Sequence, residues 1–278
     1  MKLVVSTDEL AHHPQWRVFD CRFDLGKPAL GEQQYAGAHI PGARYAHLDR
    51  DLSSPKSGSN GRHPLPERAA FVAWLGRQGL KSTDPVVCYD AGGGVTASRL
   101  WWMLRWLGHE AVAVLDGGYA KWVAEGRPVT TEVPAFENAV YESAPETRTA
   151  VDAAFVEDHL QTTDVLLLDA RSPARFLGEK EPIDPEAGRI PGAVNRFCND
   201  NLDAHGLFKS AEALRSEYGR ILGDRTPQEI VHYCGSGVSA CHNALAMELA
   251  GLRGSRLYAG SWSEWIADPR RPRARGPA

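Results

Sequence analysis

The chain has 278 residues, which is enough for one large domain or two domains of ordinary size. Its residues are 43% hydrophobic and 24% charged, and the formal net charge is −4, so the composition is typical of a globular protein and gives no reason to expect a nucleic-acid partner. No apolar run approaches the length of a membrane span and residues 1–10 show no signal-peptide pattern, so we expect no membrane partner and a cytoplasmic protein.

Short apolar runs alternate with helical patterns along the whole chain. In the first half the expected strands and helices are 16–20, 66–78 (helix), 86–90, 97–107 (helix) and 111–115. In the second half they are 165–170, 211–221 (helix), 230–234, 240–250 (helix) and 256–259. Nearly continuous apolar strands that alternate with helices indicate an α/β protein whose parallel sheets are covered by helices on both faces.

The chain repeats itself after about 150 residues. Four matched pairs occur in the same order in both halves, namely 18–22 with 167–171, 38–43 with 188–193, 87–97 with 231–240, and 116–122 with 259–265. The repeat indicates a duplicated domain. We therefore expect an N-terminal domain at 1–135, a linker rich in Pro, Glu, Ser and Thr at 136–149, and a C-terminal domain at 150–278. Its arginine-rich tail, 269–278, is expected to be a frayed, solvated end.

One of the five cysteines, Cys234, is placed for chemistry. It ends the apolar run 230–233 and opens a glycine-bearing loop that leads into the helix 240–250. Glycines let successive backbone N–H groups turn toward the sulfur, and the following helix N-terminus lowers a thiol pKa from its free value of about 8.5. Asp90 stands at the corresponding position of the first half, which we therefore interpret as non-catalytic.

The other four cysteines are interpreted as small buried residues. Five is an odd number, which together with the missing signal peptide favours a reducing compartment over a disulfide framework. The spacing contains no CxxC pair and no Cys/His pattern of a zinc site, so neither a metal nor another cofactor is expected.

The duplication, the loop Cys-Gly-Ser-Gly-Val-Ser at 234–239 in the second half only, and Ile-Pro-Gly at both 40–42 and 190–192 resemble the two-domain rhodanese-type sulfurtransferases. The resemblance covers roughly residues 4–268. It implies two tandem rhodanese-like domains, an active site in the cleft between them, and a persulfide carried on Cys234. Neutral Gly235 and Ser236 after the cysteine are similar to the 3-mercaptopyruvate sulfurtransferases, whereas thiosulfate enzymes tend to have basic residues there.

The activity implied is a ping-pong transfer of sulfur from 3-mercaptopyruvate to a thiol, such as thioredoxin or a small thiol, or to cyanide. Thiosulfate remains an alternative donor, and a non-catalytic sulfur carrier or binding module is a more distant one. Cysteine phosphatases share this type of fold but require an arginine six residues after the cysteine, where this chain has Ala240.

The resemblance also implies roles for individual residues. Arg175 matches the arginine that holds the substrate anion, and Arg171 is a second candidate. Mercaptopyruvate enzymes commonly have another arginine nine residues after the first, where this chain has Asp184. Arg189 replaces a histidine before the second Ile-Pro-Gly and is expected to supply the missing charge. The remaining substrate-binding candidates are the loop residues Gly235, Gly237, Val238 and Ser239.

Ser236 is expected to act with a histidine, either to bind the donor carbonyl or to relay a proton. His39 precedes the first Ile-Pro-Gly and matches the family's histidine, so a Ser236–His39 pair is predicted. Asp24 and Glu32 are both possible acidic partners of His39. The segment 61–66 is similar to a loop that faces the active site, which makes its Arg62 and His63 further candidates for contact with the substrate.

Overall fold

The computed structural model describes residues 1–277, and Ala278 at the end of the predicted tail lies outside them. Contacts within the chain divide it into two compact units. The first contains Met1–Ser54, Pro66–Thr147 and Ala204–Leu207, and the second contains Pro55–Leu65, Arg148–Asp203 and the chain from Phe208 onward. Residues 55–65 therefore group with the second unit, although the repeat pattern alone assigns them to the first.

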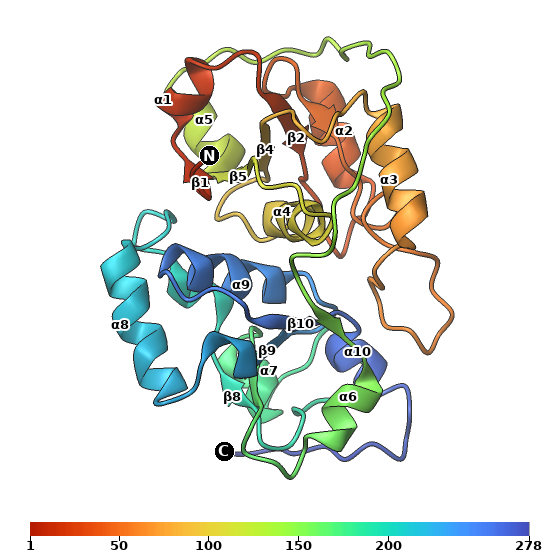
Figure 1. Ribbon diagram of the computed structural model, residues 1–278, viewed down its shortest axis with the longest axis vertical. Coiled ribbons are helices and arrows are strands. Elements are labelled where there is room, and N and C mark those ends of the chain that lie inside the picture. The colour runs from red at the N-terminus through yellow and green to blue at the C-terminus, as the bar shows by residue number, and fades with distance from the viewer. Residues whose placement is uncertain (278) are drawn as a thin grey trace. The chain divides into compact units, whose positions relative to one another are not determined.

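The first unit is built on a five-stranded parallel sheet with the strand order β1-β5-β4-β2-β3. Its strands are β1 (Val4–Val5), β2 (Arg17–Asp20), β3 (Arg44–Tyr45), β4 (Val86–Tyr89) and β5 (Val112–Leu115). Its helices are α1 (Thr7–Ala11), α2 (Leu30–Gly37), α3 (Arg68–Arg77), α4 (Ala97–Trp106) and α5 (Gly118–Ala124), as Figure 1 shows.

The second unit repeats this topology strand for strand, with the parallel order β6-β10-β9-β7-β8. Its strands are β6 (Ala150–Val151), β7 (Leu166–Asp169), β8 (Val194–Asn195), β9 (Ile230–Tyr233) and β10 (Arg256–Tyr258). Its helices are α6 (Ala153–Asp158), α7 (Pro173–Leu177), α8 (Ala211–Leu222), α9 (Ser239–Leu249) and α10 (Ser261–Trp265), with 3₁₀ turns at Cys198–Asn201 and Pro227–Glu229.

Alternate residues of the central strands explain why helices cover both faces of the sheet. In β7, Leu166 and Leu168 join a buried cluster with residues of α8 and α9, whereas Leu167 joins a second cluster that includes Trp262 of α10. Because successive side chains of a strand point to opposite faces, two apolar faces must both be covered. The predicted fold class, two tandem parallel sheets each covered on both faces, is thereby confirmed. Among the described residues, none of the helices combines the length and the apolar character that a membrane span requires.

Both units contain the same buried ion pair at the end of a central strand. In the first unit Arg22 donates to both oxygens of Asp20 and to a backbone carbonyl, and its guanidinium lies over the ring of Tyr119. In the second unit Arg171 repeats these bonds with Asp169. Burial opposes charge on Arg171, but the neighbouring Asp169 raises its pKa above the ordinary value. The occurrence of this pair in both copies identifies Arg171 as a part of the scaffold, which corrects its interpretation as a substrate-binding residue.

The arginine-rich C-terminal segment packs onto the second unit, so the prediction of a frayed, solvated tail is wrong. The indole of Trp265 donates to the carbonyl of Pro272 at 2.8 Å, and Arg273 donates to the carbonyl of Ile266 at 2.9 Å. Arg189 donates in turn to the carbonyls of Gly276 and Pro277, at 2.6 and 3.1 Å. Arg189 thus holds this segment, and the structure does not support its expected role in binding the substrate.

His232 in the middle of β9 makes folding sensitive to acid. It is fully buried, and neither ring nitrogen has a hydrogen-bond partner among the described residues. Burial lowers the pKa of His232 from 6.5 to about 3. Between these pH values the unfolded chain binds a proton at His232 that the folded chain excludes. Protonation of His232 therefore costs no unfolding free energy well above pH 6.5, and its cost grows as the pH falls toward 3.

We expect His232→Leu to weaken this pH dependence. Between pH 7 and pH 5 the wild type loses roughly 2 kcal/mol of unfolding free energy through this group alone, and the variant does not. Urea unfolding of both proteins at the two pH values measures the difference, with a substitution of the exposed His12 as the control. An equal loss in wild type and His232→Leu would contradict the assignment.

Candidate active site

The strand β9 delivers Cys234 to a loop whose backbone faces the sulfur. Cys234 follows the last residue of β9, and α9 begins at Ser239. Its Sγ accepts hydrogen bonds from the backbone N–H of Ser236 at 3.4 Å and of Gly237 at 3.1 Å. Only 2% of the residue is exposed. Converging peptide N–H groups stabilise negative charge, so the loop is shaped to accept an anion at the position of the sulfur.

Gly237 is required by both the turn and the close packing of the loop. Its φ is +74°, and a Cβ at this position would lie 2.3 Å from the carbonyl oxygen of Ala259. Any other side chain would have to push β10 and the loop apart. The glycine therefore fixes the direction of the N–H group that points at the sulfur of Cys234.

The start of α10 holds the loop through hydrogen bonds to the backbone of Cys234 and Gly235. The N–H groups of Trp262 and Ser263 donate to the carbonyls of Cys234 and Gly235, at 3.0 and 2.9 Å. Ser261 accepts a hydrogen bond from the N–H of Cys234 at 3.1 Å and donates to the carbonyl of Tyr258 at 2.9 Å. These bonds fix the backbone on both sides of the sulfur.

Ser261 has a strained backbone, and the repeat shows why. Its φ is +56°, and it is the one non-glycine residue with positive φ among the described residues. The corresponding residue of the first unit is Gly118, which has the same φ. Serine keeps a conformation that suits glycine because its hydroxyl binds the N–H of Cys234.

The loop serine pairs with a histidine other than the one that the sequence predicts. The hydroxyl of Ser236 lies 2.7 Å from Nδ1 of His63, which belongs to the segment 55–65 of the same unit. In the first unit, Nδ1 of His39 bonds to the carbonyl of Tyr35 at 2.7 Å and Nε2 bonds to the carbonyl of Glu132 at 3.1 Å. His39 is fully buried and stacks on Tyr35. The predicted Ser236–His39 pair is therefore wrong, and His63 takes its place.

The two acidic candidates for that pair have other roles. Asp24 accepts hydrogen bonds from the backbone of Gly26 and Lys27 in its own turn. Glu32 pairs with Arg50 at 2.7 Å on the surface. Neither is therefore available as the orienting group of a catalytic histidine.

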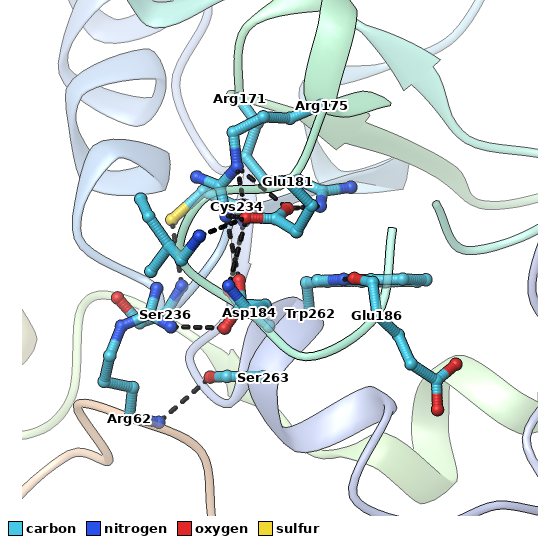
Figure 2. A network of polar contacts seen from close by, with 12 residues as sticks. Arg62, Arg171, Arg175, Glu181, Asp184, Glu186, Cys234, Ser236, Trp262 and Ser263 are labelled. Carbon is cyan, nitrogen blue, oxygen red and sulfur yellow. Dashed lines mark hydrogen bonds and ion pairs between the residues drawn. The ribbon is translucent and has the colours of Figure 1, made fainter. Parts of the chain in front are cut away.

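Arginines and carboxylates form a network beside the loop, shown in Figure 2. The Nε of Arg175 on α7 donates to both oxygens of Glu181, and its Nη2 donates to Asp184 at 2.8 Å. Arg62 donates to the other oxygen of Asp184. Burial alone would raise the pKa of Glu181, but hydrogen bonds from Arg175 and from the backbone of Asp184 lower it below its usual value.

This network lies directly over the residue that follows the cysteine. A Cβ added to Gly235 would be 2.8 Å from Nη2 of Arg62 and 3.4 Å from Nη2 of Arg175. Gly235 therefore leaves room for two guanidinium groups next to Cys234. Of the other loop candidates, Val238 is buried and caps α9, and Ser239 is partly exposed.

In the first unit the corresponding loop binds its own side chain. The carboxylate of Asp90 accepts hydrogen bonds from the backbone N–H groups of three loop residues, Gly92, Gly94 and Thr96, and of Ala97 at the start of α4. The loop is a filled anion site rather than an open one. A loop whose anion site is filled by its own side chain gives a physical reason for the interpretation of the first unit as non-catalytic.

Sequence reasoning missed two contributions to this site, those of Ser261 and Glu181, and did not assign the roles of His63 and Arg62. Ser261 and Glu181 carry no motif, although the alignment of Ser261 with Gly118 is visible in the repeat. His63 was one of two neighbouring candidates in the segment 61–66, and only the fold shows that it reaches Ser236. Arg62 reaches the carboxylate of Asp184 from the same segment.

Comparison with known proteins places this geometry in a family. Residues 5–125 and 152–268 both match the family described as the rhodanese-like domain. A protein of Pseudomonas aeruginosa named "Probable 3-mercaptopyruvate sulfurtransferase" is 47% identical over 265 residues, which cover 95% of this chain and 93% of the relative. The thiosulfate sulfurtransferase of Mus musculus is 35% identical over 279 residues, covering 95% and 92%. The solved 3-mercaptopyruvate sulfurtransferase from Leishmania major superposes with a TM-score of 0.84 at 31% identity, covering 98% of this chain and 75% of that chain.

The strain at Ser261 can be separated from its hydrogen bond with two substitutions. Ser261→Ala keeps the strain and leaves the buried N–H of Cys234 unpaired, which should cost about 1–3 kcal/mol of unfolding free energy. Ser261→Gly loses the same bond but relieves the left-handed backbone, so it should be about 1 kcal/mol more stable than the alanine variant. Urea unfolding measures both values. An alanine variant as stable as the wild type would show that the hydroxyl does not support the loop.

Proposed function

Since the chain belongs to the rhodanese family of sulfurtransferases, we propose that it moves sulfane sulfur from 3-mercaptopyruvate to a thiol or cyanide through a persulfide on Cys234. It is an enzyme of the kind that its relatives represent, which are named 3-mercaptopyruvate and thiosulfate sulfurtransferases. One observation carries the proposal: two backbone N–H groups of the loop point at the sulfur of Cys234.

In the first half-reaction the Cys234 thiolate attacks the sulfur of 3-mercaptopyruvate. A sulfur–sulfur bond forms, the carbon–sulfur bond breaks, and its electron pair leaves with the carbon as pyruvate enolate. The persulfide keeps the hydrogen of the donor thiol until it ionises, and protonation of the enolate carbon gives pyruvate. The N–H groups of Ser236 and Gly237 stabilise the negative charge on the sulfur before and after the transfer.

Ser236 and His63 act on the oxygen of the donor. The 2.7 Å contact between them aligns the serine hydroxyl two residues from the nucleophile. When the carbon–sulfur bond breaks, negative charge develops on the carbonyl oxygen of the donor, and a positioned hydroxyl can donate a hydrogen bond to it. His63 orients this hydroxyl and can exchange a proton with it.

Arg175 and Arg62 bind the carboxylate of the donor. Both guanidinium groups lie over Gly235, next to the nucleophile, and a planar guanidinium suits a carboxylate. Val238 and Ser239 lead from the loop into α9 and are the remaining candidates for contact with the donor. The site thus combines two cationic side chains for the carboxylate, a hydroxyl for the carbonyl, and a nucleophile for the sulfur.

In the second half-reaction the acceptor attacks the outer sulfur of the persulfide. A thiolate of thioredoxin or of a small thiol leaves as its own persulfide, and cyanide leaves as thiocyanate. Cys234 returns as a thiolate in each case, so the two half-reactions form a ping-pong cycle.

Thiosulfate is the second candidate donor, because the relatives also include thiosulfate sulfurtransferases. The absence of a basic residue in the loop 234–239 favours the monoanionic keto acid over this dianion. Both donors use the same persulfide, so the choice between them is a question of anion binding.

Intact-protein mass after incubation with each donor, without an acceptor, tests the proposal. We expect 3-mercaptopyruvate to add one sulfur atom that maps to Cys234, and thiosulfate to add little. Cys234→Ser should take up no sulfur, whereas Cys241→Ser, on the helix behind the loop, should be loaded normally. Faster loading by thiosulfate would make thiosulfate the donor in place of 3-mercaptopyruvate. No gain in mass from either donor would overturn the persulfide mechanism.

The roles of the two histidines differ in a way that kinetics can measure. Ser236→Ala and His63→Gln should each lower kcat with 3-mercaptopyruvate by roughly 100-fold, because they remove the hydroxyl or its orienting partner. They should also change the shape of the pH–rate profile. His39→Gln should lower the melting temperature, because it breaks two buried hydrogen bonds, and leave the profile unchanged. A kinetic defect in His39→Gln with none in His63→Gln would reverse this assignment.

A further inference from the structure

We propose that the carboxylate of Asp184 occupies the position between Arg62 and Arg175 where the carboxylate of the donor would bind, and thereby determines donor specificity. We call this position the anion seat. The inference rests on the proposed function, since it concerns the same site. It states that a donor must compete with Asp184 for Arg62 and Arg175, and that dianions are disfavoured most.

Asp184 binds these arginines in the way that a substrate carboxylate would. One oxygen accepts from Nη2 of Arg175 at 2.8 Å, and the other accepts from Nη1 of Arg62. The side chain of Asp184 is only 2% exposed, so these bonds replace water almost completely. A carboxylate with one oxygen on each of two guanidinium groups is a fully occupied anion site.

The position of the carboxylate connects it with the chemistry. A Cβ on Gly235 would lie 3.5 Å from Oδ2 of Asp184, and the same point is close to both guanidinium groups. Gly235 follows the nucleophile directly. Figure 2 shows Asp184 between Arg175 and Arg62.

The charges of the network cancel. Its three arginines, Arg62, Arg171 and Arg175, are matched by three carboxylates, those of Asp169, Glu181 and Asp184. An anionic donor therefore enters a site with no excess positive charge unless Asp184 moves aside. Repulsion from Asp184 increases with the charge of the donor, so thiosulfate is penalised more than 3-mercaptopyruvate.

Asp184 can leave the seat without the loss of a helix or strand. It lies between α7 and β8, in a stretch without regular secondary structure. Its backbone N–H donates to Glu181, and the neighbouring Ile183 is 43% exposed. Rotation of the Asp184 side chain would free the nitrogen that each of the two arginines gives to it.

Replacement of Asp184 by asparagine tests the inference through binding and kinetics. Asp184→Asn should bind inorganic sulfate, a dianion, roughly tenfold more tightly in isothermal titration, with a smaller gain for the monoanion pyruvate. It should also lower KM for thiosulfate by about the same factor and lower KM for 3-mercaptopyruvate less.

Glu181→Gln is the matched control, because it removes one negative charge from the same arginine, Arg175, without removing the carboxylate that Arg175 shares with Arg62. A gain that is equal in both variants would mean that net charge alone acts and would overturn the role of Asp184 as an occupant of the seat. Unchanged sulfate affinity in a folded Asp184→Asn protein would also overturn it. If that variant does not fold, Asp184→Ser provides the same comparison.

The sulfate titration does not depend on turnover. Suppose that the wild type gains no sulfur from either donor, while Asp184→Asn binds sulfate more tightly than the wild type. This result would contradict the persulfide mechanism but support the role of Asp184. If 3-mercaptopyruvate loads the wild type with sulfur but Asp184→Asn binds sulfate no more tightly, the persulfide mechanism would stand and the role of Asp184 would be contradicted.

Discussion

The peptide N–H groups of the loop that follows the central strand converge on one point, and each copy of the domain places a different acceptor there. In the first unit the carboxylate of Asp90 accepts four of these groups, whereas in the second the sulfur of Cys234 accepts two. A backbone that is shaped to hold an anion is useful for catalysis only when its acceptor can react. Aspartate fills the site with its own carboxylate, whereas cysteine places there a sulfur atom that the proposed reaction uses as the nucleophile.

Precision at the sulfur depends on contacts that carry no chemistry. The start of α10 fixes the backbone of Cys234 and Gly235 through three hydrogen bonds, one of which requires the strained backbone of Ser261. The buried Asp169–Arg171 pair anchors the end of the neighbouring strand β7. Because these supports are bonded to one another, few groups remain for the proposed contacts with a donor: the loop, the Ser236–His63 pair, and the two arginines that share Asp184.

Most of the fold could be predicted from the sequence, because its signals are local. The central strands are nearly continuous apolar runs, and the repeat places each in its copy. The two-residue edge strands β1, β3, β6 and β8 were missed, since so short a segment has no periodicity. Within the site, the glycine-bearing loop 234–239 predicted the importance of Cys234. Its partners could not be predicted in the same way, because His39 and His63 both follow plausible motifs, and only the hydrogen bonds of the folded chain show that His39 is fully engaged with its own backbone.

The duplication supplies an internal comparison that separates scaffold from site. Features shared by both copies, such as the strand order and the buried Asp–Arg pair, are needed for folding whether or not chemistry takes place. Features that differ mark the site: Asp90 against Cys234, and Gly118 against Ser261. Arg171 and Arg175 lie on the same short segment, yet the comparison divides them, because Arg171 has a counterpart in Arg22 while Arg175 is bound to carboxylates beside the loop. The arginine that has no counterpart in the scaffold is therefore the one to which the proposed reaction assigns the donor, in exchange for its bond to Asp184.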